Sequence, residues 1–300
     1  MVRRRQQGRG TQLRAIHGLF FGRAFALLGP TLLIAVATAW AGETTDPKLE
    51  IVSRDRQITL HRSDLLRRAD LEYIEVDNDQ AYPKLKLRYQ AVKLAALLSQ
   101  FKAGPDDELL VTASDGYASR IPYSQVSKTA SNQPVPYLAI ENPQSKWPPL
   151  RAGKPDTAGP YYVVWVNPNR SSIDVHSWPW SVSMVTIATT GDNPVLLPSA
   201  ELAADSPEWL GYRVYAKNCW SCHTLNDDGP ARMGPDLNLP MNPTEYFREE
   251  ILGTFIRDQQ SVRRIPGSRM NAFAETDISD AELNQLLAYL RHMAERKVGR

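Results

Sequence analysis

The chain has 300 residues, of which 42% are hydrophobic and 23% are charged, and its formal net charge is +2. This composition is typical of a soluble globular protein of about two domains, and it excludes a disordered chain, a collagen-like chain and a multispan membrane protein. The 2 cysteines exclude a disulfide-dense scaffold.

The first 41 residues have the layout of a secretory signal peptide. An acid-free stretch with six arginines precedes an apolar run from Ala24 to Ala39, and the small residues Ala39 and Ala41 predict cleavage before Gly42. A retained membrane anchor is the alternative, because the run is close to the shortest length that spans a bilayer. We therefore expect export to the periplasm, with a membrane association only if this segment is retained.

Removal of this segment reverses the charge of the protein. Without its six arginines, 29 of the 35 Lys and Arg residues remain against 33 Asp and Glu residues, a formal net charge of −4. A basic nucleic-acid-binding protein is therefore disfavoured.

Residues 42–190 have the pattern of a β-rich α+β domain. Runs of β-branched and aromatic residues, separated by Pro, Gly and Asn, predict strands at Leu109–Ala113, Tyr161–Val166 and Val182–Thr189. The stretch from Tyr89 to Phe101 has helical spacing and predicts a helix. The residues expected to face the core from this helix are Val92, Ala95, Ala96 and either Leu97 or Leu98.

Several segments between about residues 50 and 190 resemble one known domain. They are Tyr89–Leu98, Glu108–Val111, Ala113–Tyr117 with its Asp-Gly-Tyr end, Ile121-Pro122, Pro136–Ile140, Pro149–Gly153 and Tyr161–Trp165. In this order they resemble the molybdopterin-binding domain of the sulfite oxidase family, which implies a sulfite oxidase-like fold. That family holds molybdenum through a cysteine thiolate, whereas Asp77 to Tyr82, near the position expected for that cysteine, contains none.

Two other features of this region invite functional hypotheses. His61 and His176, with Asp64 and Asp174 nearby in sequence, suggest a metal site, although a hydrogen-bonded histidine is the more ordinary interpretation. The segment Trp178-Pro179-Trp180 suggests a recognition surface or an aromatic path toward a redox group, with core packing as the alternative.

The C-terminal region begins after a predicted linker. Residues 191–205 contain Gly and Pro without a sustained period and predict a linker, and from residue 206 the spacing becomes helical. Ser206 followed by Pro207 predicts an N-cap and first turn of a helix that runs into Cys219-Trp-Ser-Cys222-His223.

The Cys-x-x-Cys-His motif indicates covalent attachment of one c-type haem. Thiols one helical turn apart can add to the two vinyl groups of haem, and the imidazole of His223 then reaches the iron. A structural zinc site would need two more ligands, and a thioredoxin-like pair would not need His223. Because haem uses both Cys219 and Cys222, no thiolate remains for molybdenum, so we expect no molybdenum and a cofactor-free domain at residues 42–190.

Residues 206–300 resemble a class I cytochrome c, an all-α domain. The resemblance rests on Gly211 and Tyr215, eight and four positions before Cys219, and on a last helix that starts with the capping box Ser279-Asp-Ala-Glu282. This last helix carries an apolar stripe of Leu283, Leu286, Leu287, Leu290 and Met293. The resemblance implies that the two helices cross, with Leu286, Tyr289 and Leu290 as the matching contacts.

The same resemblance implies the groups around the iron. The carbonyl of Pro235, twelve residues after His223, would accept the Nδ1 proton of His223, and Met270 would be the sixth ligand. Asn271 replaces the proline that usually follows this methionine. Met241 is the rival ligand, whereas Met233 lies on the proximal loop and Met293 belongs to the helical stripe.

The sequence therefore predicts a periplasmic monohaem c-type cytochrome, and no residue is assigned a catalytic role. It would carry single electrons from a dehydrogenase or reductase to a cytochrome or oxidase, with residues 42–190 as a docking or scaffold module. The first alternative is the haem-bearing subunit of an oxidoreductase with a site in residues 50–190. The second is an N-terminal domain that binds a pterin-like or other ligand without turnover.

Overall fold

The computed structural model describes residues 46–299, except 129, 131, 169–172, 190 and 192. The predicted signal peptide, residues 1–41, lies outside the described residues. Within the described ranges, none of the helices has both the length and the apolar character needed to cross a membrane. The described residues all belong to one compact unit.

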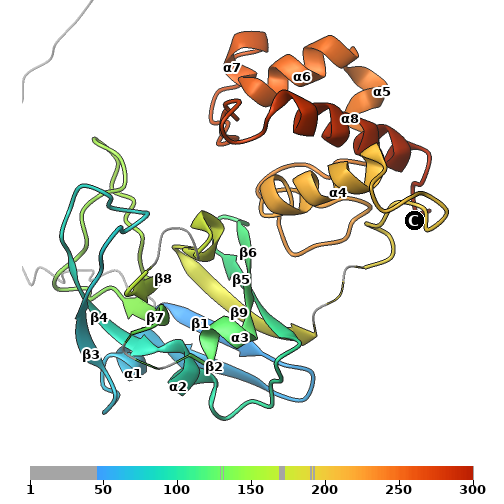
Figure 1. The fold of residues 1–300 in the computed structure, drawn as a ribbon. Helices are drawn as coiled ribbons and strands as arrows, with labels where there is room; N and C mark the ends of the chain where they lie inside the picture. The colour runs from blue at the N-terminus through green and yellow to red at the C-terminus, as the bar shows by residue number, and fades with distance from the viewer. Residues whose placement is uncertain are drawn as a thin grey trace, which may run out of the picture. The chain divides into compact units, whose positions relative to one another are not determined.

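The N-terminal region contains a mixed five-stranded sheet with the order β2-β1-β9-β5-β6 (Figure 1). Its strands are β1 (Lys48–Val52), β2 (Gln57–His61), β5 (Asp107–Ala113), β6 (Ala118–Pro122) and β9 (Val182–Thr189). Strand β1 pairs with β2 in antiparallel and with β9 in parallel orientation. The parallel pair joins the beginning of the region to its end.

A second, antiparallel sheet of four described strands has the order β3-β4-β7-β8. Its strands are β3 (Glu72–Glu75), β4 (Arg88–Lys93), β7 (Val135–Ile140) and β8 (Tyr161–Val166). Nearly every residue of β7 and β8 is buried, which explains their continuous apolar runs in place of an alternating pattern. The short helices α1 (Arg62–Leu65), α2 (Leu94–Leu98) and α3 (Tyr123–Val126) and the 3-10 turn η1 (Val175–Ser177) complete the described elements of the region.

The two sheets share one hydrophobic core. Leu49 and Leu109 from the first sheet and Tyr89 and Leu138 from the second belong to the same cluster of buried residues. The strands predicted at Tyr161–Val166 and Val182–Thr189 coincide with β8 and β9, and Leu109–Ala113 lies within β5, so these predictions are confirmed.

The helix predicted from Tyr89 to Phe101 is wrong in its first half. Residues up to Lys93 form β4, and only Leu94–Leu98 are helical. Strand β4 pairs with both β3 and β7, where Val92 lies opposite Leu138. Tyr89, Ala91 and Val92 are all buried, so the apolar spacing that mimics a helix reflects a strand covered on both faces. Ala95 and Ala96 are only half-buried.

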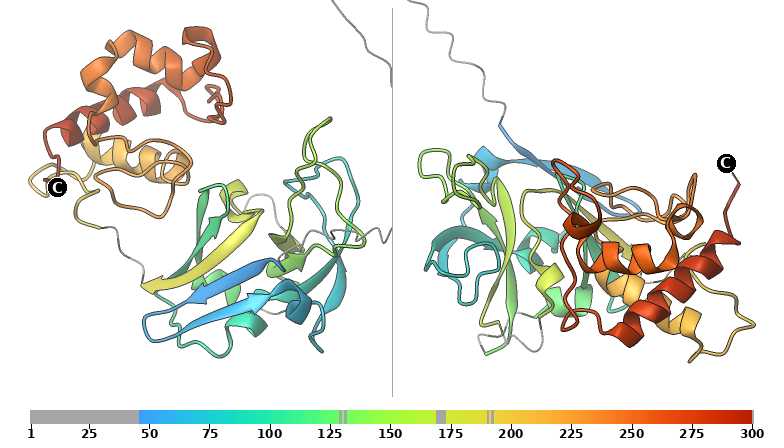
Figure 2. Two further views of the ribbon diagram at one scale, coloured as in Figure 1. Left: turned by 180° about the vertical axis from the view of Figure 1, so that it is seen from behind. Right: turned by 90° about the horizontal axis from the view of Figure 1, so that it is seen from above.

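The C-terminal region is helical, as predicted. Its helices are α4 (Pro207–Asn218), α5 (Pro243–Tyr246), α6 (Glu249–Arg257), α7 (Gln259–Val262) and α8 (Asp280–Ala294). Helix α8 lies between α4 on one side and α5 and α6 on the other (Figures 1 and 2). These helices enclose a second cluster of buried residues, distinct from that of the two sheets.

Helices α4 and α8 cross at Gly211. A Cβ atom on Gly211 would lie 2.0 Å from the carbonyl oxygen of Gln285, so the two helices meet backbone to backbone at this point. The rings of Tyr215 and Tyr289 pack beside the crossing, with centroids 5.5 Å apart. The predicted N-cap of α4 at Ser206 and the capping box of α8 at Ser279 are both present.

The segment predicted as a linker contacts the helical core. Leu196 is buried within the cluster of the helical region, and its carbonyl oxygen accepts a hydrogen bond of 2.7 Å from the Tyr289 hydroxyl. Asn226 Nδ2 also donates to the carbonyl oxygen of Val195 at 3.0 Å. Residues 195 and 196 therefore pack as part of the helical region.

Candidate functional site

The Cys-x-x-Cys-His motif forms a tight turn at the end of α4. Cys219 is the C-cap of the helix, and its carbonyl oxygen accepts hydrogen bonds from the backbone N–H groups of Cys222 (3.0 Å) and His223 (2.9 Å). This turn brings two thiols and one imidazole together within five residues of chain.

Cys219 and Cys222 are not joined by a disulfide bond. Burial, and then the neighbouring Cys222, raise the pKa of Cys219 to about 12. Burial and the charge of Asp115 raise the pKa of Cys222, while Arg269 opposes the shift. Both groups therefore carry their proton at neutral pH, as S–H groups that can add across a vinyl double bond.

His223 is held as a neutral imidazole with one defined tautomer. Burial lowers its pKa, and the hydrogen bond to the Pro235 carbonyl acts in the opposite direction. That hydrogen bond, which the resemblance to class I cytochrome c implies, is present at 2.7 Å between Nδ1 of His223 and the carbonyl oxygen of Pro235. A carbonyl can only accept, so Nδ1 carries the proton and the lone pair of Nε2 is available for a metal ion.

Gly234 packs directly against the ring of His223. A Cβ atom at Gly234 would lie 2.3 Å from Cε1 of His223, and the backbone N–H of Gly234 donates to the carbonyl oxygen of Cys222 at 2.8 Å. Sequence reasoning missed this residue, although the Gly234-Pro235 pair is itself a turn signal. Glycine is required here because any side chain would displace the imidazole.

A network of buried asparagines anchors the loop after the motif to α8. Nδ2 of Asn238 donates to Oδ1 of Asn226 (2.8 Å) and to the carbonyl oxygen of Met293 (2.7 Å). Nδ2 of Asn242 donates to the carbonyl oxygen of Leu290 at 2.9 Å. These donors pair with carbonyl oxygens in the last turns of α8. The loop that carries Pro235 is thereby fixed to the helical core.

The methionines considered as the sixth ligand lie in different surroundings. Met270 is half-buried against the helical core, and its carbonyl oxygen accepts a hydrogen bond of 2.6 Å from Gln259 Nε2. Met233 lies beside the motif, with its sulfur 3.7 Å from the sulfur of Cys222. Met241 is 51% exposed and Met293 is buried in α8. The role of Met270 stays a prediction.

The chemistry of these groups fits a covalently attached haem better than a bare metal ion. In the part of the chain that the structure describes, no group of three or more His, Cys, Asp and Glu side chains is placed to hold a metal ion. Two protonated thiols next to one neutral imidazole are instead the set that attaches a porphyrin and ligates its iron from one side. Cys219, Cys222 and His223 would hold the haem, with Pro235 fixing the imidazole.

The histidines of the N-terminal region have protein partners. Nδ1 of His176 lies 2.8 Å from the Tyr117 hydroxyl, and its backbone N–H donates to Asp174. Nδ1 of His61 lies 3.9 Å from the carboxylate of Asp46. Trp178 is buried, whereas Trp180 is 39% exposed. These contacts favour the hydrogen-bonded interpretation of His176, whereas the His61 side chain is 41% exposed and lies too far from Asp46 for a hydrogen bond.

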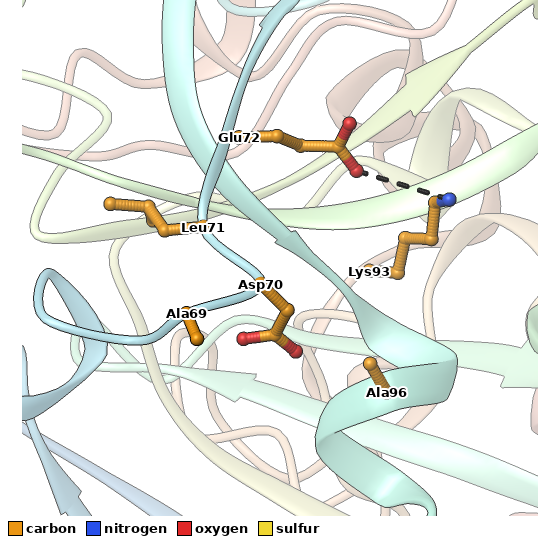
Figure 3. Close-up of a pocket in the computed structure, with 6 residues that line it drawn as sticks. All are labelled: Ala69, Asp70, Leu71, Glu72, Lys93 and Ala96. Atoms are coloured by element: carbon orange, nitrogen blue, oxygen red, sulfur yellow. Dashed lines mark ion pairs between the residues drawn. The ribbon is translucent and has the colours of Figure 1, made fainter.

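Two cavities of the N-terminal region are candidate ligand-binding sites. The first, of about 310 Å³, lies between the chain before β3 and the start of α2, and Figure 3 shows its side chains. The ion pair of Lys93 with Glu72, at 3.9 Å, borders this cavity. Its lining residues are Ala69, Asp70, Leu71, Glu72, Lys93 and Ala96, which include no cysteine, serine or histidine.

The second cavity, of about 320 Å³, lies beside the buried carboxylate of Asp79. Its lining includes Asn78, Asp79, Gln80, Pro83, Ile173 and Trp178. Asp79 accepts hydrogen bonds from the backbone N–H groups of Ala81 (2.9 Å) and Tyr82 (3.0 Å) and from the hydroxyl groups of Tyr89 and Tyr162. Asp79 lies in the stretch from Asp77 to Tyr82, near the position at which the sulfite oxidase resemblance implies a cysteine.

Part of the C-terminal region is similar to a known protein family. Residues 210–294 match the family model described as Cytochrome c. No curated protein matches the chain. The match supports the c-type cytochrome part of the prediction, with the c-type haem and haem-mediated electron transfer that such a domain implies. It does not extend to residues 42–190, so the sulfite oxidase-like fold stays a prediction.

Proposed function

We propose that this protein is an exported, periplasmic cytochrome with one covalent haem that passes single electrons between redox partners. The observation that carries the proposal is the hydrogen bond between His223 and Pro235 beside Cys219 and Cys222, within the region that matches cytochrome c. The motif occurs once in the chain, which is consistent with one haem.

The haem supplies a one-electron couple between ferric and ferrous iron. The residues of the chain decide how that couple is used: Cys219 and Cys222 fix the porphyrin, and His223 provides a strong ligand whose orientation Pro235 sets. Met270 would be a second protein ligand of the iron, and iron held by two protein ligands favours electron transfer over oxygen activation.

The N-terminal region would serve as a docking or scaffold module. Its β-rich fold presents no metal-ligand cluster in the described ranges, and fold resemblance alone does not carry an activity. The electron donor would be a dehydrogenase or reductase and the acceptor a cytochrome or oxidase. Such encounters are transient and bury less than about 1,200 Å².

Expression with a c-type maturation system tests the proposal. We expect the purified protein to retain haem after denaturation, to show a mass increase of one haem, and to have low-spin spectra in both redox states. His223→Ala should lose the low-spin spectrum. Met270→Ala should give a ferrous haem that binds carbon monoxide readily, whereas the matched control Met241→Ala should not. A colourless protein would contradict the proposal.

The cavity beside Asp79 favours a second candidate function. As the haem-bearing part of an oxidoreductase, the protein would oxidise a small substrate bound in this cavity and pass the electrons to its own haem. Alternatively, the cavity would bind a pterin-like ligand without turnover. Haem reduction by the purified chain upon addition of a substrate would establish this activity. Native mass spectrometry that finds haem as the sole non-protein component would remove a resident ligand.

A further inference from the structure

The turn that joins the antiparallel strands β5 and β6 contains a residue in the left-handed region of backbone conformation. Gly116 has a φ of +89°, and the turn is closed by hydrogen bonds from Ala113 N to the carbonyl oxygen of Tyr117 (2.8 Å) and from Gly116 N to that of Ala113 (3.1 Å). The carboxylate of Asp115 accepts from Tyr117 N at 3.1 Å. The turn therefore presents its remaining backbone groups in a fixed geometry.

These backbone groups bind the two segments that flank His223. The backbone N–H at the end of the turn, from Ala118, donates to the carbonyl oxygen of Ser221 at 2.9 Å. Arg232 N donates to the carbonyl oxygen of Gly116 at 2.7 Å. A Cβ atom at Gly116 would lie 2.7 Å from the backbone carbon of Arg232, so the approach requires glycine.

A charge on the same turn reaches the loop of the predicted sixth ligand. The carboxylate of Asp115 pairs with the guanidinium of Arg269 at 2.8 Å, and Arg269 directly precedes Met270. The Asp115 side chain is 27% exposed and that of Arg269 48%, so the pair is partly shielded from water. One turn thus contacts the chain before His223, the chain after it, and the residue next to Met270.

Side chains in and next to the turn contact both the β-rich region and the helical region. On the β-rich side, the Tyr117 hydroxyl lies 2.8 Å from Nδ1 of His176. On the helical side, the guanidinium of Arg120 lies 4.0 Å over the ring of Trp220, the residue after Cys219. Ala118 is completely buried and belongs to the core of the helical region.

We propose that the turn from Asp115 to Tyr117 positions the haem site. It would fix the Cys219–His223 loop and the loop that carries Met270 relative to each other. Asp115 acts as a positioning residue through Arg269 and touches neither haem nor iron. The inference rests on the proposed haem ligation. The N-terminal region would then have a specific role in the haem site, because without the turn the Met270 loop would move away from the Cys219–His223 loop.

The rate of carbon monoxide binding to the ferrous haem measures opening of this loop, since the gas enters only when the sixth ligand has left. Asp115→Asn keeps the hydrogen bond from Tyr117 N and removes the charge. We expect this variant to bind carbon monoxide roughly two- to fivefold faster, the factor that corresponds to one partly exposed ion pair. The matched control is Asp64→Asn, which removes an exposed ion pair with Arg67 and should leave the rate unchanged.

A charge exchange provides the second test. Asp115→Arg and Arg269→Asp should each accelerate carbon monoxide binding, and the double variant should restore the rate toward that of the natural chain. If both single variants bind at the natural rate while Met270→Ala binds fast, the inference is wrong although the haem ligation stands. If no covalent haem is found, the proposed function itself fails.

A backbone test avoids any change of charge. Gly116→Ala and Gly153→Ala both place a side chain at a positive φ, but a Cβ at Gly153 would meet no atom within 4 Å. We expect Gly116→Ala to accelerate carbon monoxide binding about tenfold, from the clash with Arg232, and Gly153→Ala to leave the rate unchanged. Equal rates in the two variants would overturn the inference.

Discussion

At the scale of single residues, Asp236 organises the loop that supports His223. Its carboxylate accepts hydrogen bonds from the backbone N–H groups of Asp227, Asn238 and Leu239, each at 2.7 Å. Burial acts to raise the pKa of Asp236, but these hydrogen bonds outweigh it and hold the pKa below the ordinary value. The charged form is therefore the one that the fold stabilises.

Asp236→Asn tests this role through the pH dependence of stability. Because the folded pKa is lowered, the contribution is fully present above the unfolded value of 3.8 and is lost as the pH falls through the folded pKa. We expect the variant to be less stable at pH 7 by about 1–3 kcal/mol, and this difference to shrink in acid. Urea unfolding at both pH values measures it. A difference that is the same at pH 7 and in acid would contradict the charge-based account.

At the scale of elements, the crossing of α4 and α8 is the contact that shapes the helical region. Gly211 on α4 lets the backbone reach Gln285 on α8, and the buried stripe of α8 continues the contact along the helix. The capping box at Ser279 and the N-cap at Ser206 mark where both helices start. Local signals thus set the helix boundaries, and one glycine sets the distance between the helices.

Two helical glycines make a matched test of this crossing. Gly211→Ala should destabilise the protein by about 2 kcal/mol or more, because the added Cβ would overlap the Gln285 carbonyl. Gly253→Ala in α6, where the Cβ would lie 3.8 Å from a Leu283 methyl group, should stabilise it by about 0.5–1 kcal/mol. Urea unfolding of both variants measures the difference, and the same sign of change in both would contradict the assigned contact.

The spacing of apolar residues predicted some of these strands correctly and one incorrectly. β8 and β9 were predictable because their apolar runs are bounded by turn residues. The apolar spacing of Tyr89–Lys93 fits both a helix and a strand. Pairing with β7, where Val92 lies opposite Leu138, 46 residues away, makes this stretch a strand. Such long-range pairing leaves no local mark in the sequence.

At the scale of the whole molecule, the β-rich and helical regions have separate hydrophobic cores joined by the turn at Gly116. The core of the two sheets includes Leu138 and Tyr162, and the core of the helices includes Tyr215 and Tyr289. The core of the sheets contains no residue of the helices, whereas the core of the helices includes Ala118 from β6. We therefore expect the core of the sheets to remain folded without the haem.

Removal of the haem attachment tests this separation. We expect the variant with both Cys219→Ser and Cys222→Ser to lose protection in the helical region, with amide exchange at least about tenfold faster. Peptides from β4, β7 and β8 should exchange at the natural rate and serve as the internal control. Hydrogen exchange resolved by mass spectrometry measures both regions in one sample. A uniform loss of protection would show that the two cores unfold together.

The amino-acid sequence by itself determined the Cys-x-x-Cys-His motif and the helix caps, because each depends on residue types at short and fixed spacings. The resemblance to class I cytochrome c implied the crossing glycine and the Pro235 hydrogen bond. Only the tertiary structure decided that Tyr89–Lys93 is a strand, that Gly234 supports the imidazole, and that the turn at Gly116 binds the segments around His223. These contacts join residues far apart in the chain, and their geometry exists only after the sheets and helices have packed.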